Sequence, residues 1–211
     1  GRALLRVMRH DRAALGQVFV PMHWTRQPSR NGTVNSLTGP AVDPISGQPA
    51  LKSGAVTVKR FDGAWYGFAA GHGQMAPEAE YAAVMRSATG WRGEFGGRVR
   101  PENWEEYARN LLACPQDHAS VMQDTHSGLV RIAFHKGAVL TGLFFASPSP
   151  VRLGRDHVVA LIGTESAALQ ALAGWGGADQ VDPGQTICAC MNVGLNTVRD
   201  AISAGAATVD A

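Results

Sequence analysis

The sequence predicts a mixed α+β fold arranged in three consecutive zones. Residues 1–60 hold short apolar runs separated by Gly, Pro and Asn, a pattern typical of strands and turns. Residues 61–180 combine helical spacing of apolar side chains with continuous apolar runs, and residues 181–211 hold two neighbouring cysteines before a helical pattern. Since 45% of the 211 residues are hydrophobic, the chain can bury a core.

Composition excludes several classes of partner. The formal net charge is only +2, from 19 Lys and Arg against 17 Asp and Glu, so no excess of cations is present to neutralise the phosphates of a nucleic acid. Three cysteines do not indicate a secreted disulfide framework and favour a reducing compartment. The strongest apolar runs, VLTGLFFA and HVVALIG, are too short to cross a bilayer. We therefore expect a soluble, cytoplasmic protein that binds neither nucleic acid nor a membrane.

The first zone is predicted to be half of a β-barrel. Its opening residues alternate like a strand, a second strand follows in VFVPMHW (residues 18–24), and another is predicted in GAVTVKRF (residues 54–61). An Arg-rich transit peptide is the alternative for the opening residues, but they continue directly into the second strand. Because the pattern starts in mid-sheet and the chain stops just after a helix, we interpret the sequence as a fragment of a longer protein.

The second zone is predicted to contain helices and a hairpin. Pro opens PEAEYAAVMRSAT (residues 77–89) and PENWEEYARNLLA (residues 101–113), and both carry apolar residues at helical spacing. Cys114 is expected to be a small buried residue at the end of the second helix. Residues 127–147 predict a hairpin that turns at Lys136 and Gly137, and residues 165–175 predict a short helix.

The third zone places Cys188 and Cys190 one residue apart in TICACMN. A disulfide between them would close a very small, strained ring, so a shared metal or cluster is the more economical interpretation. A complete zinc or iron-sulfur site generally needs four ligands, and the chain has only three cysteines. A helix is predicted after the pair, capped by Asn196 and ended by Gly205. The alternative is two partly buried cysteines without a ligand.

Two stretches resemble the bacterial molybdopterin oxidoreductases, most closely the assimilatory nitrate reductases. The first is GQVFVPMHWT followed by VNSLTGPAVDPISGQPALKSGAVTV, which is similar to the end of the molybdopterin-dinucleotide-binding domain. The second, GQTICACMNVGLNTVRDAISAGAATV, is similar to the start of a [2Fe-2S] domain of the bacterioferritin-associated-ferredoxin type. The resemblance implies three parts: the end of a double-psi-type β-barrel at residues 1–60, an α+β connecting segment at 61–180, and a truncated, small helical iron-sulfur domain at 181–211.

The same resemblance assigns candidate site residues. Asn35 of the N-x-L-T motif and Lys52 after DPISGQP correspond to residues that contact the pterin, which suits an amide and an ammonium group. We expect His23 and Trp24 to line the same cleft. The alternatives are a turn asparagine, a solvated lysine and a histidine packed beside a tryptophan. Cys188 and Cys190 correspond to the first two of four cluster ligands, with a C-x-x-C pair expected beyond Ala211.

For the intact enzyme, the resemblance implies reduction of nitrate to nitrite at molybdenum held by two molybdopterin guanine dinucleotides. Electrons would arrive from a flavoprotein, an NAD(P)H reductase subunit or a ferredoxin through iron-sulfur clusters, one of them in an N-terminal part not present here. No catalytic residue is assigned in this chain, and without the remainder of the polypeptide it is expected to be inactive. Two alternatives are another molybdopterin oxidoreductase, such as a formate dehydrogenase, and a noncatalytic iron-sulfur electron-transfer protein.

Overall fold

The computed structural model divides the chain into two compact units, Gly1–Trp175 and Gly176–Ala211. The residues that the structure describes are 1–7, 13–22, 24–26, 29–50, 54–176, 186–188 and 193–206. The elements of the first unit are β1 (Ser29–Arg30), η1 (Val34–Leu37), β2 (Trp65–Gly71), β3 (Tyr81–Ser87), β4 (Gly90–Gly97), α1 (Trp104–Leu112), β5 (His118–Asp124), β6 (Leu129–Lys136), β7 (Val139–Ser147), α2 (Arg155–Leu161) and α3 (Ala168–Ala173). Those of the second unit are β8 (Thr186–Cys188), β9 (Val193–Gly194) and α4 (Leu195–Ser203).

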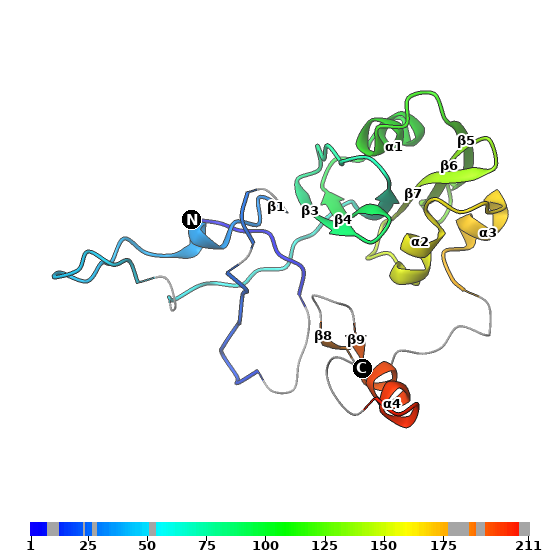
Figure 1. Ribbon diagram of the computed structural model, residues 1–211. Helices are drawn as coiled ribbons and strands as arrows, with labels where there is room; N and C mark the ends of the chain where they lie inside the picture. The colour runs from blue at the N-terminus through cyan, green and yellow to red at the C-terminus, as the bar shows by residue number, and fades with distance from the viewer. Residues whose placement is uncertain are drawn as a thin grey trace. The chain divides into compact units, whose positions relative to one another are not determined.

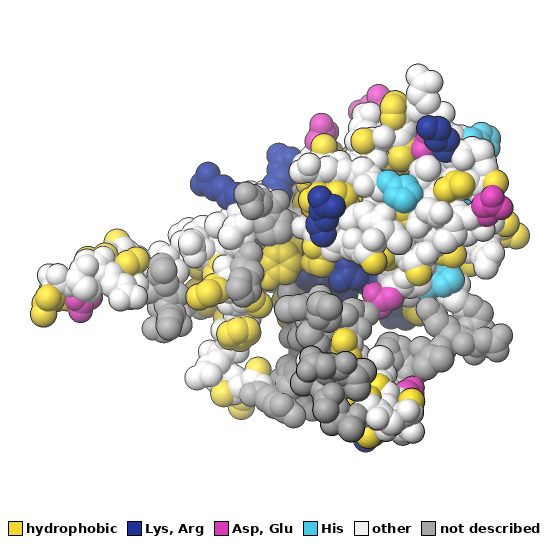
Figure 2. Space-filling model, in the orientation of Figure 1, with side chains coloured by type: hydrophobic (Ala, Val, Ile, Leu, Met, Phe, Trp, Pro, Cys, Tyr) yellow, Lys and Arg dark blue, Asp and Glu magenta, His cyan; other side chains and the backbone are white. Residues whose placement is uncertain are grey.

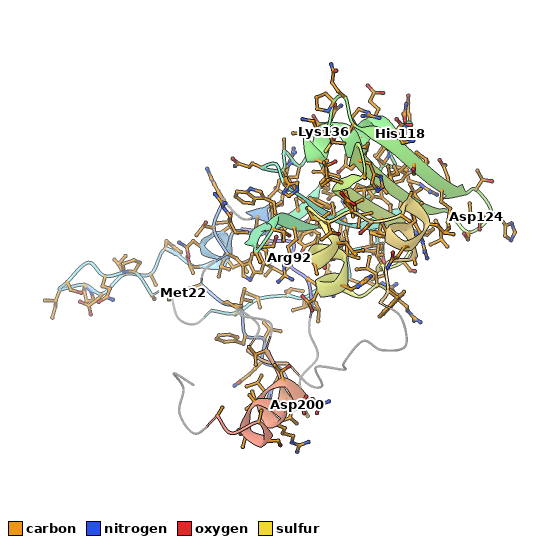
Figure 3. The ribbon with its side chains drawn as sticks, turned by 45° about the vertical axis from the view of Figure 1, so that its right-hand side comes forward. Met22, Arg92, His118, Asp124, Lys136 and Asp200 are labelled. Carbon is orange, nitrogen blue, oxygen red and sulfur yellow. The ribbon has the colours of Figure 1, made fainter. Side chains whose placement is uncertain are left out.

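Residues 65–175, here called the sheet module, contain most of the regular structure (Figure 1). With β1, their strands form one antiparallel sheet of order β1-β3-β4-β2-β7-β6-β5. The first strand of the module, β2, lies in the middle between β4 and β7. His118 and Lys136 lie near one end of the β5–β6 pair and Asp124 at the other, as the register requires (Figure 3).

Both faces of the sheet are buried, which produces two apolar cores. Neighbouring residues of β7 point to opposite faces, so Phe144 packs with α1 whereas Phe145 packs with α2 and α3. Phe144 is fully buried and contacts the rings of Trp104 and Tyr107, with ring centroids 5.8 and 5.7 Å away. Burying one such side chain contributes roughly 1.5–3 kcal/mol, so these two cores supply much of the stability of the module.

The helix predicted at residues 101–113 is confirmed as α1, although it begins at Trp104, so Pro101 precedes the helix instead of opening it. Asn103 caps it, because its side-chain oxygen accepts a hydrogen bond of 3.1 Å from the backbone N–H of Glu106. The apolar face buries Trp104, Ala108, Leu111 and Leu112 against the sheet. The helix ends at Ala113, which adopts a left-handed conformation with φ of 53°.

The helix predicted at residues 77–89 is wrong, since residues 81–87 form β3. Tyr81, Val84 and Met85 have helical spacing, but every residue from Tyr81 to Ser87 pairs with β4. Ala82 and Val84 face the α1 core, and Ala83 is also buried, on the opposite face. Hydrogen bonds to β4 together with burial on two faces outweigh the high helix propensity of alanine.

Later elements follow the predicted pattern. The hairpin at residues 127–147 is confirmed as β6 and β7, and Gly137 has the positive φ of 63° that its tight turn requires. The short helix expected at residues 165–175 is confirmed as α3. In the second unit, α4 confirms the predicted helix and Gly205 follows its end with φ of 104°. Its N-cap is Gly194 rather than the predicted Asn196, which lies inside the first turn.

The strands predicted at residues 18–24 and 54–61 do not form in the described part of the chain, where regular structure before residue 61 is confined to β1, η1 and the isolated bridge between Val42 and Pro49. The physical reason is the lack of a covering layer: Phe19 is 88% and Val58 is 65% exposed. Figure 2 shows such apolar side chains at the surface of this region. The described residues therefore do not close the expected half-barrel.

A candidate cofactor loop and a cysteine pair

Residues 24–38, here called loop 24–38, bring two of the predicted site residues into one local structure. The backbone N–H of Val34 donates to the carbonyl oxygen of Trp24 at 3.1 Å, which places Trp24 beside the residue that precedes Asn35. The N–H of Ser29 donates to the carbonyl of Thr25 at 3.2 Å, so the loop folds back on itself at a second point. Trp24 is half-buried, whereas Asn35 is exposed.

Asn35 lies in the single turn of η1, where hydrogen bonds fix the backbone and the Asn35 side chain is exposed. The hydroxyl of Thr38 donates to the carbonyl oxygen of Asn35 at 2.9 Å, and the hydroxyl of Ser36 donates to that of Thr33 at 2.7 Å. Within the described residues, no hydrogen bond joins the Asn35 side-chain amide to another group. An exposed amide on a fixed turn can offer donors and an acceptor to a heterocyclic ligand such as a pterin.

His23 and Lys52 lie outside the described residues, so the structure does not place either side chain. The motif that precedes Lys52 does form an ordered turn. Asp43 Oδ1 accepts hydrogen bonds from the N–H groups of Ser46 and Ile45 at 2.7 and 3.0 Å. These bonds, the Ser46 backbone bond foremost, lower the pKa of Asp43. Gly47 completes the turn with φ of 70°.

The backbone of Cys188 lies close to the start of α4. Cys188 pairs with Val193 in the two-stranded β8–β9 sheet, and α4 begins two residues later at Leu195. The Cys188 side chain and the whole of Cys190 are outside the described residues. No group of three or more His, Cys, Asp or Glu suited to a metal ion occurs in the described part of the chain.

Cys114 is confirmed as a small buried residue and does not complete a thiolate set. It is 6% exposed, and burial together with nearby Asp117 raises the pKa of its thiol to about 11. At neutral pH it stays protonated within the α1 core. The chain therefore offers at most two thiolates, Cys188 and Cys190, of the four that a [2Fe-2S] cluster generally requires.

The structure also shows residues that sequence reasoning missed around loop 24–38. Asn31, Arg6 and Glu94 connect this loop and the N-terminal segment to the sheet module. The Asn31-Gly32 dipeptide signals a turn, and Asn31 does adopt a left-handed φ of 58°. Nothing in the sequence pairs Arg6 with Glu94, because the two residues are 88 positions apart.

Comparisons with known proteins match both the first 55 residues and most of the chain. Residues 1–55 match the family described as the molydopterin dinucleotide binding domain. The chain is similar to a nitrate reductase of Klebsiella oxytoca, with 30% identity over 200 residues, which is 92% of this chain and 22% of the relative. A nitrate reductase of Synechocystis sp. is 47% identical over 58 residues, 28% of this chain and 8% of the relative. No solved structure matches the chain.

The chain thus spans less than a quarter of the length of either curated relative. The matches confirm the molybdopterin part of the resemblance and the similarity to nitrate reductases. The assimilatory subtype and the [2Fe-2S] domain stay predictions. In the described residues, no helix has the length and apolar character needed to span a membrane.

Proposed function

We propose that this chain is part of a molybdenum-dependent nitrate reductase in which residues 1–60 complete the site for a molybdopterin guanine dinucleotide. The observation that carries the proposal is the match of residues 1–55 to the dinucleotide-binding domain, in a chain whose loop 24–38 presents Trp24 and Asn35 together. The bound molybdenum cofactor supplies the oxygen-atom transfer that converts nitrate to nitrite. The protein residues bind and orient it.

In this proposal, the Asn35 amide pairs with the polar edge of a pterin and Lys52 supplies a positive charge to the anionic cofactor. Trp24 and His23 line the same cleft. Support comes from the exposed Asn35 side chain, whose amide makes no hydrogen bond to another described residue, and from the hydrogen bond that ties Val34 to Trp24. The two similar proteins are both nitrate reductases, which favours nitrate over the formate of a formate dehydrogenase.

The exposed apolar side chains of the first zone support a partner within the same polypeptide. Leu15, Phe19 and Ile45 are each more than four-fifths exposed, and the described residues supply no layer that covers them. Exposed apolar residues in this number mark a surface that packs against another element. We propose that the remainder of the dinucleotide-binding domain covers them in the intact enzyme, and that its barrel closes only then.

In the second unit, Cys188 and Cys190 are proposed as the first two ligands of a [2Fe-2S] cluster completed by two cysteines beyond Ala211. Cys188 pairs with Val193 of β9, and β9 leads directly into α4. This arrangement supports the role, since a helix N-terminus stabilises thiolates and the added charge of a reduced cluster. Such a cluster would pass electrons from a flavoprotein, an NAD(P)H reductase or a ferredoxin towards a further cluster and the molybdenum. This electron path and a cytoplasmic location stay predictions.

The proposed cofactor role of loop 24–38 is tested by Asn35→Ala in the intact enzyme. Loss of the amide should lower the molybdenum and pterin content after gel filtration, together with nitrate reduction by a small artificial reductant. Gln123→Ala, which removes an exposed amide from β5, is the matched control and should change neither quantity. An Asn35→Ala enzyme with full cofactor content and full activity would refute the assignment.

The iron-sulfur role is tested separately by Cys188→Ser. A hydroxyl is a much poorer iron ligand than a thiolate, so iron content and donor-linked nitrate reduction should fall. Molybdenum content and activity with the artificial reductant should survive. Cys114→Ser should leave all four quantities unchanged. Full iron content in Cys188→Ser would show that this cysteine has a structural role instead.

A further inference from the structure

Loop 24–38 is joined to the sheet module through the edge of β3. Within this loop, Ser29 and Arg30 form β1, which pairs with Ala83 and Ala82 of β3. The Arg30 guanidinium also donates to the carbonyl oxygen of Pro77 at 3.1 Å. The loop that contains Trp24 and Asn35 thus shares backbone hydrogen bonds with a strand whose other edge is fully paired with β4.

Asn31 lies at the junction of three segments. Its side-chain amide donates to the carbonyl oxygen of Glu80 at 2.8 Å, just before β3, and its own carbonyl accepts from the N–H of Leu4 at 2.6 Å. Asparagine tolerates the left-handed φ of 58° observed here better than most residues do. A Cβ at Gly32 would lie 2.0 Å from the Ser29 hydroxyl and 3.0 Å from the carbonyl oxygen of Leu4, so a larger residue there would force Ser29 to move. Asn31 therefore fixes the direction of loop 24–38 relative to β3 and to residues 1–7.

A second connection is the ion-pair cluster of Arg6, Glu94 and Arg155. Arg6 Nη1 lies 2.6 Å from Glu94 Oε1 on β4, and Arg155 at the start of α2 bonds the same carboxylate through Nε. The Glu94 and Arg155 side chains are 20% and 25% exposed, whereas that of Arg6 is 56% exposed, so solvent screens the Arg6–Glu94 pair more than the Arg155–Glu94 pair. Burial, with Glu94 second, raises the pKa of neighbouring Tyr81 to about 12, so Tyr81 adds no competing negative charge.

From these contacts we infer that the sheet module is the platform that holds loop 24–38 in its cofactor-binding position, with Asn31 and Glu94 as positioning residues. The inference rests on the proposed role of loop 24–38 in binding the dinucleotide. It gives residues 65–175 a function beyond joining two cofactor domains. The module contains two apolar cores and presents the β3 edge and the Glu94 carboxylate as attachment points.

The test uses the intact enzyme with its molybdenum cofactor and three variants. Asn31→Asp replaces the donor to the Glu80 carbonyl with an acceptor, Arg6→Ala removes one partner of Glu94, and Arg6→Lys keeps the charge. The control is Arg92→Ala on β4, because the contact that its guanidinium makes among the described residues is with Asp156 of α2, at 3.3 Å, and not with loop 24–38. Measurements are amide hydrogen exchange of residues 29–36, the rate of cofactor loss and the melting temperature of the sheet module.

Asn31→Asp and Arg6→Ala should accelerate exchange in residues 29–36 and cofactor loss by about fivefold, the factor expected for one lost polar contact. Arg6→Lys should restore most of the difference, and Arg92→Ala should alter neither rate. Unchanged exchange in both Asn31→Asp and Arg6→Ala would refute the platform, whatever Asn35→Ala does. Faster exchange with unchanged cofactor loss would show that the attachment exists but does not position the cofactor.

Discussion

The first 60 residues and the sheet module contain similar kinds of apolar side chains, but they bury them to very different extents. Phe19 and Ile45 are 88% and 95% exposed, whereas Phe134 and Phe144 are fully buried between the sheet and α1. In the module, helices cover both faces of a sheet whose strands supply each other with hydrogen bonds. Among the described residues of the first region, only the two-residue strand β1 joins that sheet, and no helical layer covers the exposed apolar side chains. An apolar, β-branched segment becomes a strand only where a paired strand and a covering layer are both present.

The largest difference should come from removing one phenylalanine in each region. Phe144→Ala should lower the free energy of unfolding of the sheet module by about 3–5 kcal/mol, because the lost ring leaves a cavity among Trp104 and Tyr107. Phe19→Ala should change it by less than about 0.5 kcal/mol. Chemical denaturation of the full chain, followed by tryptophan fluorescence, measures both. Similar losses in the two variants would mean that residues 1–60 share the module's core.

A smaller effect is expected from arginines that differ in their surroundings. Arg109 donates from Nη1 to the carbonyl oxygens of Cys114 and Asp117, both at 2.8 Å, and its guanidinium lies 5.0 Å from the Phe134 ring centroid. Lysine cannot reproduce this fork, so Arg109→Lys should destabilise the module by about 1–3 kcal/mol.

The matched control is Arg60→Lys. Arg60 is 88% exposed and pairs only with the similarly exposed Asp62 in the described residues, so the same denaturation measurement should show no change. If Arg109→Lys leaves the free energy of unfolding unchanged, the positive charge alone, rather than the planar guanidinium, holds the segment from Cys114 to Asp117 in place.

The buried thiol of Cys114 should make the stability of the module depend on alkaline pH. Its pKa is raised from 9.0 to about 11 by burial, so the unfolded chain loses this proton first as pH rises. The stabilisation is present below about pH 9 and is lost as pH rises towards 11, an effect on the order of 1–2 kcal/mol. Cys114→Ala should show a correspondingly flatter decline in unfolding free energy over that interval. Identical pH profiles would contradict the raised pKa.

The smallest effect compares two glycines in turns with open space around them. Gly137 and Gly47 have φ of 63° and 70°, and neither would place a Cβ within 4 Å of another atom. Gly137→Ala should cost the module about 1 kcal/mol through backbone strain alone, since the β6–β7 hairpin depends on this turn. Gly47→Ala strains a turn outside the module, so the module's melting temperature should not change. If Gly47→Ala lowers the melting temperature of the module as much as Gly137→Ala does, the stabilities of the two regions are coupled.

Elements governed by local chemistry were predictable from the sequence. Asn103 caps the start of α1, and Lys136-Gly137 marks the β6–β7 turn, because caps and tight turns need particular residues within a few positions. Asn35 could be selected through the N-x-L-T motif, and the structure shows its amide exposed. The strands expected before residue 61 could not be judged locally, since their formation requires a covering layer.

The sequence by itself determined the mixed α+β class, the helix α1, the hairpin, the burial of Cys114 and the resemblance to molybdopterin oxidoreductases. Only the tertiary structure decided that residues 81–87 form β3 rather than a helix, that β2 lies between β4 and β7, and that Glu94 joins Arg6 to Arg155. The physical reason is the range of the interactions. A helix closes its hydrogen bonds within four residues, whereas a strand or an ion pair depends on groups that the chain brings together from distant positions.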